Sequence, residues 1–171
     1  MPRGGSVLSG REIRELILRG ELIRGAIDLD VQVTPNGFDL SLKDIYMFTG
    51  AGRVDFSNVN RKISEVRRVE ARDGVYFLDP GAYKVVFNEV ISLPRDMVAF
   101  GAPRSSLLRC GVMVACAVFD AGYYGRSEAL MVVGNPYGFT VEQGARIVQL
   151  TFIRIGEETE GYRGQYLGEN L

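Results

Sequence analysis

The chain has 171 residues, with 20 Lys and Arg against 21 Asp and Glu, a net charge of −1 and no histidine. This balanced charge argues against a protein that binds nucleic acid through electrostatics, because such proteins are usually basic. Without histidine the chain cannot form a Ser-His-Asp or Cys-His catalytic arrangement or a zinc site with histidine ligands. The length fits one globular domain, so we expect residues 1–171 to form a single domain.

The first element is predicted to be a helix within an N-terminal helical segment, residues 1–25. Ser9 is a candidate N-cap, and Glu12 stands three residues later, as in a capping box. Leu8 and Ile13 occupy the positions of a hydrophobic staple around that cap. Gly20 is the expected stop at the C-terminal end.

After residue 25 the pattern changes to short apolar runs separated by turn residues. Pro80-Gly81, for example, fits a type II turn with a positive φ at the glycine. Many short strands at this spacing predict an all-β fold, mainly antiparallel, of the sandwich or barrel-like kind. Residues 156–171, rich in glycine and acid, are expected to form a C-terminal flap. The predicted strands are residues 38–42, 45–48, 53–56, 65–71, 75–78, 83–91, 97–100, 112–119, 129–133, 139–141 and 145–155.

Nothing in the sequence points to a membrane or to secretion. No stretch approaches the roughly 20 apolar residues that a spanning helix needs, and residues 1–10 lack the apolar core of a signal peptide. Cys110 and Cys116 are six residues apart and are expected to be buried, unpaired thiols. We therefore expect a cytoplasmic protein without a membrane or nucleic-acid partner.

The run 103–109 is the first candidate site. Arg104 and Arg109 bring two guanidiniums, and Ser105 and Ser106 bring two hydroxyls, into one short stretch after a predicted strand. Guanidiniums bind phosphate oxygens in a forked geometry, and hydroxyls at the start of a helical turn add donors. The alternative is a capped turn with two solvated arginines.

The run 119–125 is the second candidate. Asp120 is followed by a glycine, by Tyr123 and Tyr124, and by a second glycine. Asp and Gly are typical of a β-turn, which is the alternative interpretation, but two adjacent tyrosines are not. One ring could stack on a sugar or base while the other packs inward.

The run 162–168 is the third candidate. Tyr162, Arg163 and Tyr166 lie among glycines close to the end of the chain. They could form a glycine-hinged flap that carries an arginine and two aromatic rings over a ligand. The alternative is an unstructured tail.

Taken in order, these runs belong to a set of five motifs that resembles the trimeric dUTPase and dCTP deaminase superfamily, most closely its archaeal-type dUTPase branch. The resemblance extends from about the first helix to the C-terminus. The motifs are Asn36-Gly37-Phe38-Asp39-Leu40; Arg104-Ser105-Ser106-Leu107 with Arg109 and Gly111; Phe119-Asp120-Ala121-Gly122-Tyr123-Tyr124-Gly125 followed by Asn135; Gly144-Ala145-Arg146-Ile147-Val148-Gln149-Leu150; and Tyr162-Arg163-Gly164 with Tyr166 and Gly168.

The resemblance implies a distorted jelly-roll-like β fold and a homotrimer whose active sites form between subunits. It also implies a deoxynucleoside triphosphate substrate, dUTP or dCTP, with Mg²⁺ held mainly by the phosphates. Asp120 matches the residue that orders the attacking water, Tyr123 the ring that packs on deoxyribose, and Arg104 with Ser105 the groups that stabilise the leaving phosphates. The further substrate contacts implied are Ser106, Arg109, Gln149, Tyr162, Arg163 and Tyr166, and Asp39 resembles an acid that supports the metal through water.

The superfamily contains two chemistries, hydrolysis of dUTP and deamination of dCTP. Deaminases carry a proton-shuttling glutamate where this chain has Leu130, or Val132 if the extra residues before Asn135 are placed early. An aliphatic residue cannot carry a proton, so dUTP diphosphatase is the predicted function. Glu128 would need a bulge to reach the base; it keeps a dCTP deaminase or bifunctional enzyme as the alternative. A non-catalytic nucleotide-binding relative is the other alternative. The tail also departs from the archaeal pattern, with Leu167 in place of Gln.

Overall fold

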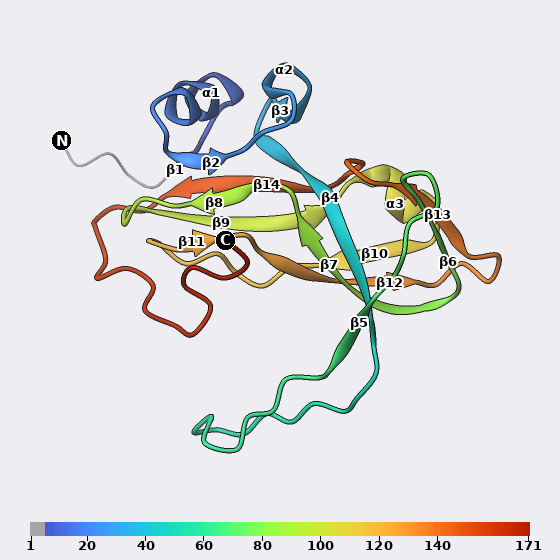
Figure 1. Cartoon of the computed structure of the whole chain (residues 1–171). Coiled ribbons are helices and arrows are strands. Elements are labelled where there is room, and N and C mark those ends of the chain that lie inside the picture. The colour runs from blue at the N-terminus through green and yellow to red at the C-terminus, as the bar shows by residue number, and fades with distance from the viewer. Residues whose placement is uncertain (1–5) are drawn as a thin grey trace.

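The computed structural model describes residues 6–171, and these form an all-β protein with short helices (Figure 1). The predicted N-terminal helix is confirmed as α1 (Gly10–Leu18). The Ser9 hydroxyl accepts from the Glu12 amide, and the Ser9 amide donates to the Glu12 carboxylate at 3.0 Å, so both halves of the capping box are present. Leu8 and Ile13 are fully buried, and Gly20 follows the helix with a φ of 83°.

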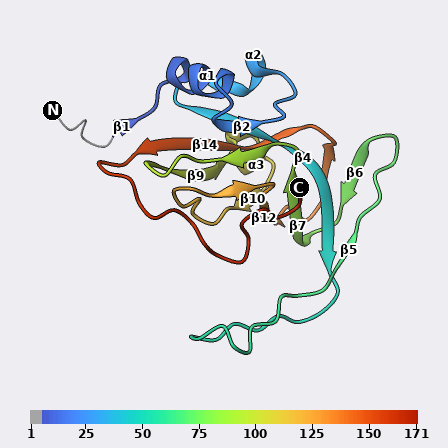
Figure 2. The same ribbon diagram turned by 60° about the vertical axis from the view of Figure 1, so that its left-hand side comes forward.

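Several short elements precede the long strands. β1 (Ser6–Val7) comes before α1, and β2 (Leu22–Arg24), α2 (Leu29–Gln32) and β3 (Val33–Thr34) follow it. The elements of residues 22–34 were not predicted, because two to four residues are too few to show a hydrophobic period. Figures 1 and 2 show α1 and α2 together on one side of the sheets.

The remaining strands pair antiparallel throughout the described residues. Their order in the largest sheet is β1-β14-β4-β7-β12-β10, with β9 also paired to β14. β9 lies beside β10, so the sheet curls round towards a barrel. The bounds are β4 (Gly37–Phe48), β5 (Val66–Arg68), β6 (Val75–Leu78), β7 (Gly81–Phe87), β8 (Val90–Ser92), β9 (Met97–Pro103), α3 (Ser105–Arg109), β10 (Val112–Ala115), β11 (Tyr124–Gly125), β12 (Glu128–Val133), β13 (Phe139–Glu142) and β14 (Arg146–Arg154).

β4 joins the two halves of this sheet. Its first residues pair with β14, and its later residues pair with β7 and β5 after a register shift between Leu42 and Asp44. Phe38, Leu40 and Leu42 are fully buried in the core. The intervening Asp39 and Ser41 are also buried, at 1% exposure. The Asp39 carboxylate pairs with Arg104 and Arg146, and the Ser41 hydroxyl donates to Glu89 of the β7–β8 turn at 2.6 Å.

The structure corrects several predicted elements. Residues 38–42 and 45–48 are one strand, β4, while 83–91 divides into β7 and β8 around Asn88 and Glu89, whose side chains bind Ser41. The strand predicted at 112–119 ends at Ala115. Gly81 begins β7 and does not have the positive φ of a type II turn. Cys110 and Cys116 are unpaired as expected, but Cys110 is exposed.

Residues 49–65, the connection between β4 and β5, form an arm that projects from the body in both views (Figures 1 and 2). The strand predicted at 53–56 lies here and is absent, apart from a single bridge between Arg53 and Lys62. Phe56 is completely exposed and Val54 is 81% exposed. The side chains of Val54 and Phe56 therefore find little surface of this chain to pack against. Over residues 6–171, none of the helices has both the length and the apolar character to cross a membrane.

Candidate active site

The turn that carries Asp120 follows a single backbone bridge between Phe119 and Ala99, near the start of β9. Phe119 and Ala99 exchange backbone hydrogen bonds of 3.0 Å, and the Tyr123 amide donates to the Asp120 carbonyl at 3.0 Å. Gly122 has a φ of 79°, and a Cβ there would lie 2.9 Å from the Cα of Gly161. Glycine at this position therefore allows the tail to pass directly over the turn.

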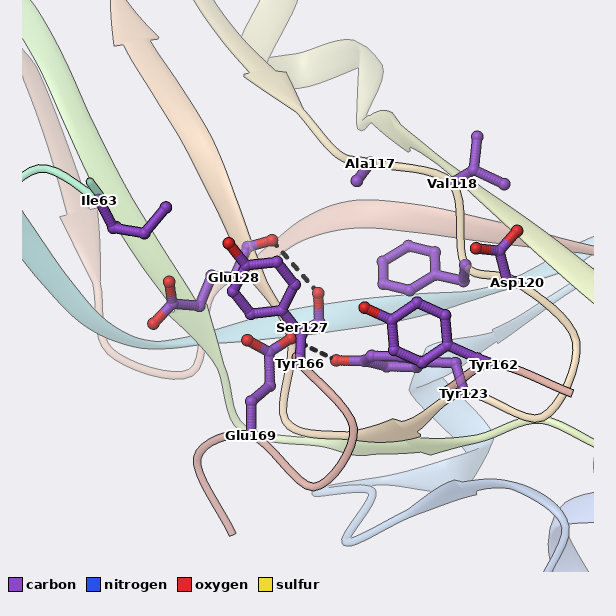
Figure 3. Close-up of a pocket in the computed structure, with 11 residues that line it drawn as sticks. Ile63, Ala117, Val118, Asp120, Tyr123, Ser127, Glu128, Tyr162, Tyr166 and Glu169 are labelled. Carbon is purple, nitrogen blue, oxygen red and sulfur yellow. Dashed lines mark hydrogen bonds between the residues drawn. The ribbon is translucent and has the colours of Figure 1, made fainter. Parts of the chain in front are cut away.

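A pocket of about 240 Å³ lies between this turn, the start of β12 and the C-terminal tail (Figure 3). The ring of Tyr123 has its centroid 5.7 Å from those of Phe119 and Tyr162, so three aromatic residues form one wall. Burial raises the pKa of Tyr123 above its ordinary value, which keeps its hydroxyl a neutral donor. The lining residues are Ile63, Ala117, Val118, Phe119, Asp120, Tyr123, Ser127, Glu128, Tyr162, Tyr166 and Glu169.

The polar groups of this pocket are mainly acidic. Tyr123 donates to the Glu169 carboxylate at 2.6 Å, and Lys84 forms an ion pair of 2.7 Å with Glu128. Burial raises the pKa of Glu169, an effect strengthened by the charge of Glu128 and opposed by the Tyr123 hydrogen bond and by Lys84. A pocket with aromatic walls and carboxylates suits the uncharged nucleoside part of a nucleotide, and it repels phosphates.

The second group of predicted residues forms a separate arginine cluster. The Asp39 carboxylate Oδ2 lies 3.0 Å from Arg104 Nε and 3.1 Å from Arg146 Nη1. Asp39 is almost fully buried, and burial raises its pKa while the two guanidiniums oppose that shift. Arg146 also donates to the Val31 carbonyl at 2.7 Å. Both arginines are therefore held in place, with about a third of each side chain exposed.

The other predicted phosphate contacts surround this cluster. Ser105, Ser106 and Arg109 are exposed on α3, where the Arg109 guanidinium donates to the Ser105 carbonyl at 3.0 Å. Gln149 of β14 lies opposite Asp39 of β4, and its side-chain amide donates to the Thr34 hydroxyl at 2.8 Å. Guanidiniums and hydroxyls together provide the donors that phosphate oxygens accept.

One chain does not bring the pocket and the arginine cluster together. Ala99 pairs with Phe119 next to Asp120, whereas Arg104 follows the other end of β9, five residues further along the chain. A strand rises about 3.3 Å per residue, so the two backbone positions lie about 16 Å apart. In Figure 1, α3 and the 120–125 turn stand at opposite ends of β9.

The described residues do not form a metal site of their own. They contain no group of three or more Cys, Asp or Glu side chains that could hold a metal ion. Asp39, predicted to support a metal through water, uses Oδ2 for the two arginines, and its Oδ1 is buried without a hydrogen-bond partner.

Sequence reasoning missed several residues that shape the site. Arg146 stands in the fourth motif but was not singled out, and Glu169 lies beyond the fifth. Arg61, from the arm, bonds to the Gln165 side chain and lies 6.0 Å from the ring centre of Tyr166. Of these residues only Arg146 could have been found from the sequence, through its position in the fourth motif. The roles of Glu169 and Arg61 depend on how the tail and the arm fold.

Arg163, one of the predicted substrate contacts, is exposed and pairs with Glu160.

Comparison with known proteins gives consistent matches. A model described as dCTP deaminase-like matches residues 7–155. "Probable deoxyuridine 5'-triphosphate nucleotidohydrolase" of Archaeoglobus fulgidus is 51% identical over 166 residues, covering 97% of this chain and 98% of its own. Deoxyuridine 5'-triphosphate nucleotidohydrolase of Methanocaldococcus jannaschii is 38% identical over 139 residues, covering 80% and 88%. The crystal structure of 2'-deoxycytidine 5'-triphosphate deaminase from Agrobacterium tumefaciens has a TM-score of 0.66 and 26% identity, over 89% of this chain and 49% of that one.

Proposed function

The chain belongs to the dCTP deaminase-like family, and we propose that it is a dUTP diphosphatase, which hydrolyses dUTP to dUMP and pyrophosphate. The observation that carries this proposal is Asp120, which stands at the edge of a pocket whose walls suit a nucleoside. The names of the archaeal relatives, at 38–51% identity, support the same reaction.

In the proposed mechanism Asp120 accepts a proton from the water that attacks the α-phosphorus, and the bond to the bridging oxygen of the pyrophosphate breaks. Tyr123 packs against the deoxyribose. Arg104, fixed by Asp39, and Ser105 bind the phosphates and stabilise the charge that develops on the leaving group. Ser106, Arg109, Gln149 and Arg163 are further proposed phosphate contacts. Mg²⁺ carried by the phosphates would neutralise part of their charge.

We also propose that the active site is shared between subunits of a homotrimer. Ala99, which pairs with the residue before Asp120, lies about 16 Å from Arg104 along β9 in one chain. The arginine cluster facing a given Asp120 would therefore come from a neighbour. An outward apolar strip on β10 and β12 supports assembly: Met113 is 57%, Leu130 41% and Val132 37% exposed.

The second candidate function is deamination of dCTP, and one observation favours it: Glu128 lines the pocket. No bulge is needed for this, since β12 keeps a regular register from Glu128 to Val133. Against it, Glu128 is already paired with Lys84 at 2.7 Å, and Leu130 in the expected shuttle position is aliphatic.

The test is one incubation series with Mg²⁺, offering dUTP and dCTP separately while pyrophosphate and ammonia are both measured. We expect pyrophosphate from dUTP and no ammonia, and a fall of about 10²–10⁴ in kcat for Asp120→Asn, the usual contribution of a general base. Ammonia from dCTP, lost in Glu128→Gln, would establish the deaminase. Tight dUTP binding without pyrophosphate would indicate a non-catalytic relative.

A further inference from the structure

Three residues near the C-terminal end fold back onto the segment that forms the pocket: Gly168, Glu169 and Asn170. The Gly168 amide donates to the Tyr124 carbonyl at 2.7 Å, and the Arg126 amide donates to the Glu169 carbonyl at 2.9 Å. Side chains strengthen this pairing, because Tyr123 donates to the Glu169 carboxylate at 2.6 Å. Glu169 and Asn170 lie beyond the five motifs.

Asn170 makes the most specific contacts of the three residues. The side-chain amide of Asn170 donates to the Arg126 backbone carbonyl at 3.0 Å and to Glu128 Oε1 at 3.2 Å. The backbone carbonyl of Asn170 accepts from Arg126 Nε at 3.0 Å. Glu128 Oε1 also receives Lys84 Nζ at 2.7 Å. Asn170 has a φ of 54°, a left-handed conformation that asparagine tolerates better than most residues. The side-chain contacts hold this conformation in place.

We propose that Glu169 and Asn170 form a C-terminal latch that holds the tail closed over the pocket of its own chain, with Glu128 as its anchor. The tail carries Tyr162 and Tyr166 across the pocket, so releasing the latch opens the pocket and engaging it closes the pocket. The effect on catalysis rests on the proposed function, because it assumes that the nucleoside occupies this pocket.

The physical basis is that a chain terminus frays unless specific contacts tie it down. Between Gly156 and the latch, the tail is held to the body by the Thr159, Tyr162 and Gly168 amides, which bond to Arg95, Ala121 and Tyr124 carbonyls. Tyr162, Tyr166 and Glu169 of this segment line the pocket, so lifting the segment widens the way in for a nucleotide. The strength of the latch therefore sets the balance between nucleotide access and retention. Glu169 and Asn170 are positioning residues in this scheme, since they act through the tail.

The direct test is amide hydrogen exchange of the nucleotide-free protein, read at the Gly168 and Tyr162 amides. We expect Asn170→Ala and Glu169→Ala to speed exchange at both amides at least about five-fold, and to leave the amides of β12 unchanged. Glu169→Gln keeps an oxygen that accepts from Tyr123 and is expected to preserve protection. Glu157→Gln is the matched control, because Glu157 is an exposed tail glutamate without a hydrogen bond or ion pair to the described residues.

The role of Glu128 as anchor is tested by a double-mutant cycle. Glu128→Ala is expected to speed exchange at Gly168, but less than Asn170→Ala does, because Asn170→Ala also removes the bond to the Arg126 carbonyl. The double variant is expected to exchange little faster than Asn170→Ala, because the contact between Glu128 and Asn170 is already lost in either single variant. Additive effects would overturn the anchor. Equal loosening by Glu169→Gln and Glu169→Ala would overturn the latch, as would a Gly168 amide that is unprotected in the unaltered protein.

A kinetic measurement links the latch to catalysis. In Asn170→Ala we expect KM for dUTP to rise at least about three-fold, with kcat reduced by a smaller factor. Because the exchange experiment uses no nucleotide, the two proposals fail separately. If the Gly168 amide is protected through Asn170 but the protein releases no pyrophosphate from dUTP, the latch is supported and the hydrolase is refuted. If the protein hydrolyses dUTP but its Gly168 amide is unprotected, the hydrolase is supported and the latch is refuted.

Discussion

Asp39 shows how one buried side chain can prepare a binding surface. It holds Arg104 and Arg146 through a single oxygen, at 3.0 and 3.1 Å. Replacing it with alanine leaves two guanidiniums without their counter-charge, and breaking such a pair usually costs about 3 kcal/mol of folding stability. We expect Asp39→Ala to lose stability of this order in urea unfolding and to raise KM for dUTP.

The matched control for Asp39 is Asp30→Ala. Asp30 pairs with Arg14 at 2.6 Å, but its side chain is 85% exposed, and exposed pairs contribute less than about 1 kcal/mol. An equal loss of stability in the two variants would mean that the Asp39 pairs are no stronger than a surface ion pair.

Glu169 gives the closed tail a predictable pH dependence. Its pKa in the docked tail is raised by burial and by Glu128, and opposed by Tyr123 and Lys84. A raised pKa means that docking favours the protonated acid, so docking is strongest below the ordinary value near 4.5 and weakens as pH rises through the docked value.

The measurement for this prediction is exchange at the Gly168 amide, corrected for the intrinsic pH dependence of exchange. Protection is expected to fall between pH 4 and neutral pH in the unaltered protein and to stay nearly level in Glu169→Gln, which carries no charge. A level profile in both proteins would show that Glu169 does not titrate in this range.

At the scale of elements, α1 depends on its capping box. Ser9 and Glu12 satisfy each other's backbone amides, and removing an N-cap hydroxyl costs about 1 kcal/mol. Ser9→Ala is therefore expected to lower the free energy of unfolding by about that amount. Ser6→Ala, an exposed serine outside the cap, should stay within about 0.5 kcal/mol.

The elements that sequence predicted well are those set by local chemistry. The capping box predicted α1, and turn residues predicted most of the strand boundaries. β4 was divided in the prediction because Lys43 and Asp44 interrupt the apolar pattern, yet Asp44 is buried by bonding to Arg68 at 2.6 and 3.0 Å. That partner comes from β5 and cannot be seen in the local sequence.

The candidate site shows the same difference: the sequence predicted what depends on local motifs and missed what depends on the fold. The motifs identified Asp120, Tyr123, Tyr162 and Tyr166, and the structure places all of them around one pocket. The motifs did not show that Arg104 lies at the far end of β9, because that separation depends on the length and pairing of a strand. Nor did they reveal the latch, whose contacts join residues more than 40 positions apart.

At the scale of the whole molecule, exposed apolar surface and the divided site point to the same assembly. Met113 and Val132 are direct cross-strand partners, as are Ala115 and Leu130, so the outward faces of β10 and β12 form one apolar strip. The strip begins at Glu128, which lines the pocket. A second copy packed on this strip would therefore lie beside the pocket, where the proposed function requires a neighbour's arginine cluster.

Mixing two inactive variants tests whether the site is shared. Asp120→Ala and Arg104→Ala should each hydrolyse dUTP poorly. The two variants are mixed in equal amounts, unfolded and refolded together. If Asp120 and Arg104 of one site come from different chains, each of the two residues is unaltered with a chance of about one half. About one quarter of the sites are then intact. We expect about a quarter of the unaltered activity in mixed trimers. A mixture that stays inactive, in particles shown by light scattering to be mixed trimers, would mean that each chain builds its own site, and that the 16 Å along β9 must be spanned within one chain.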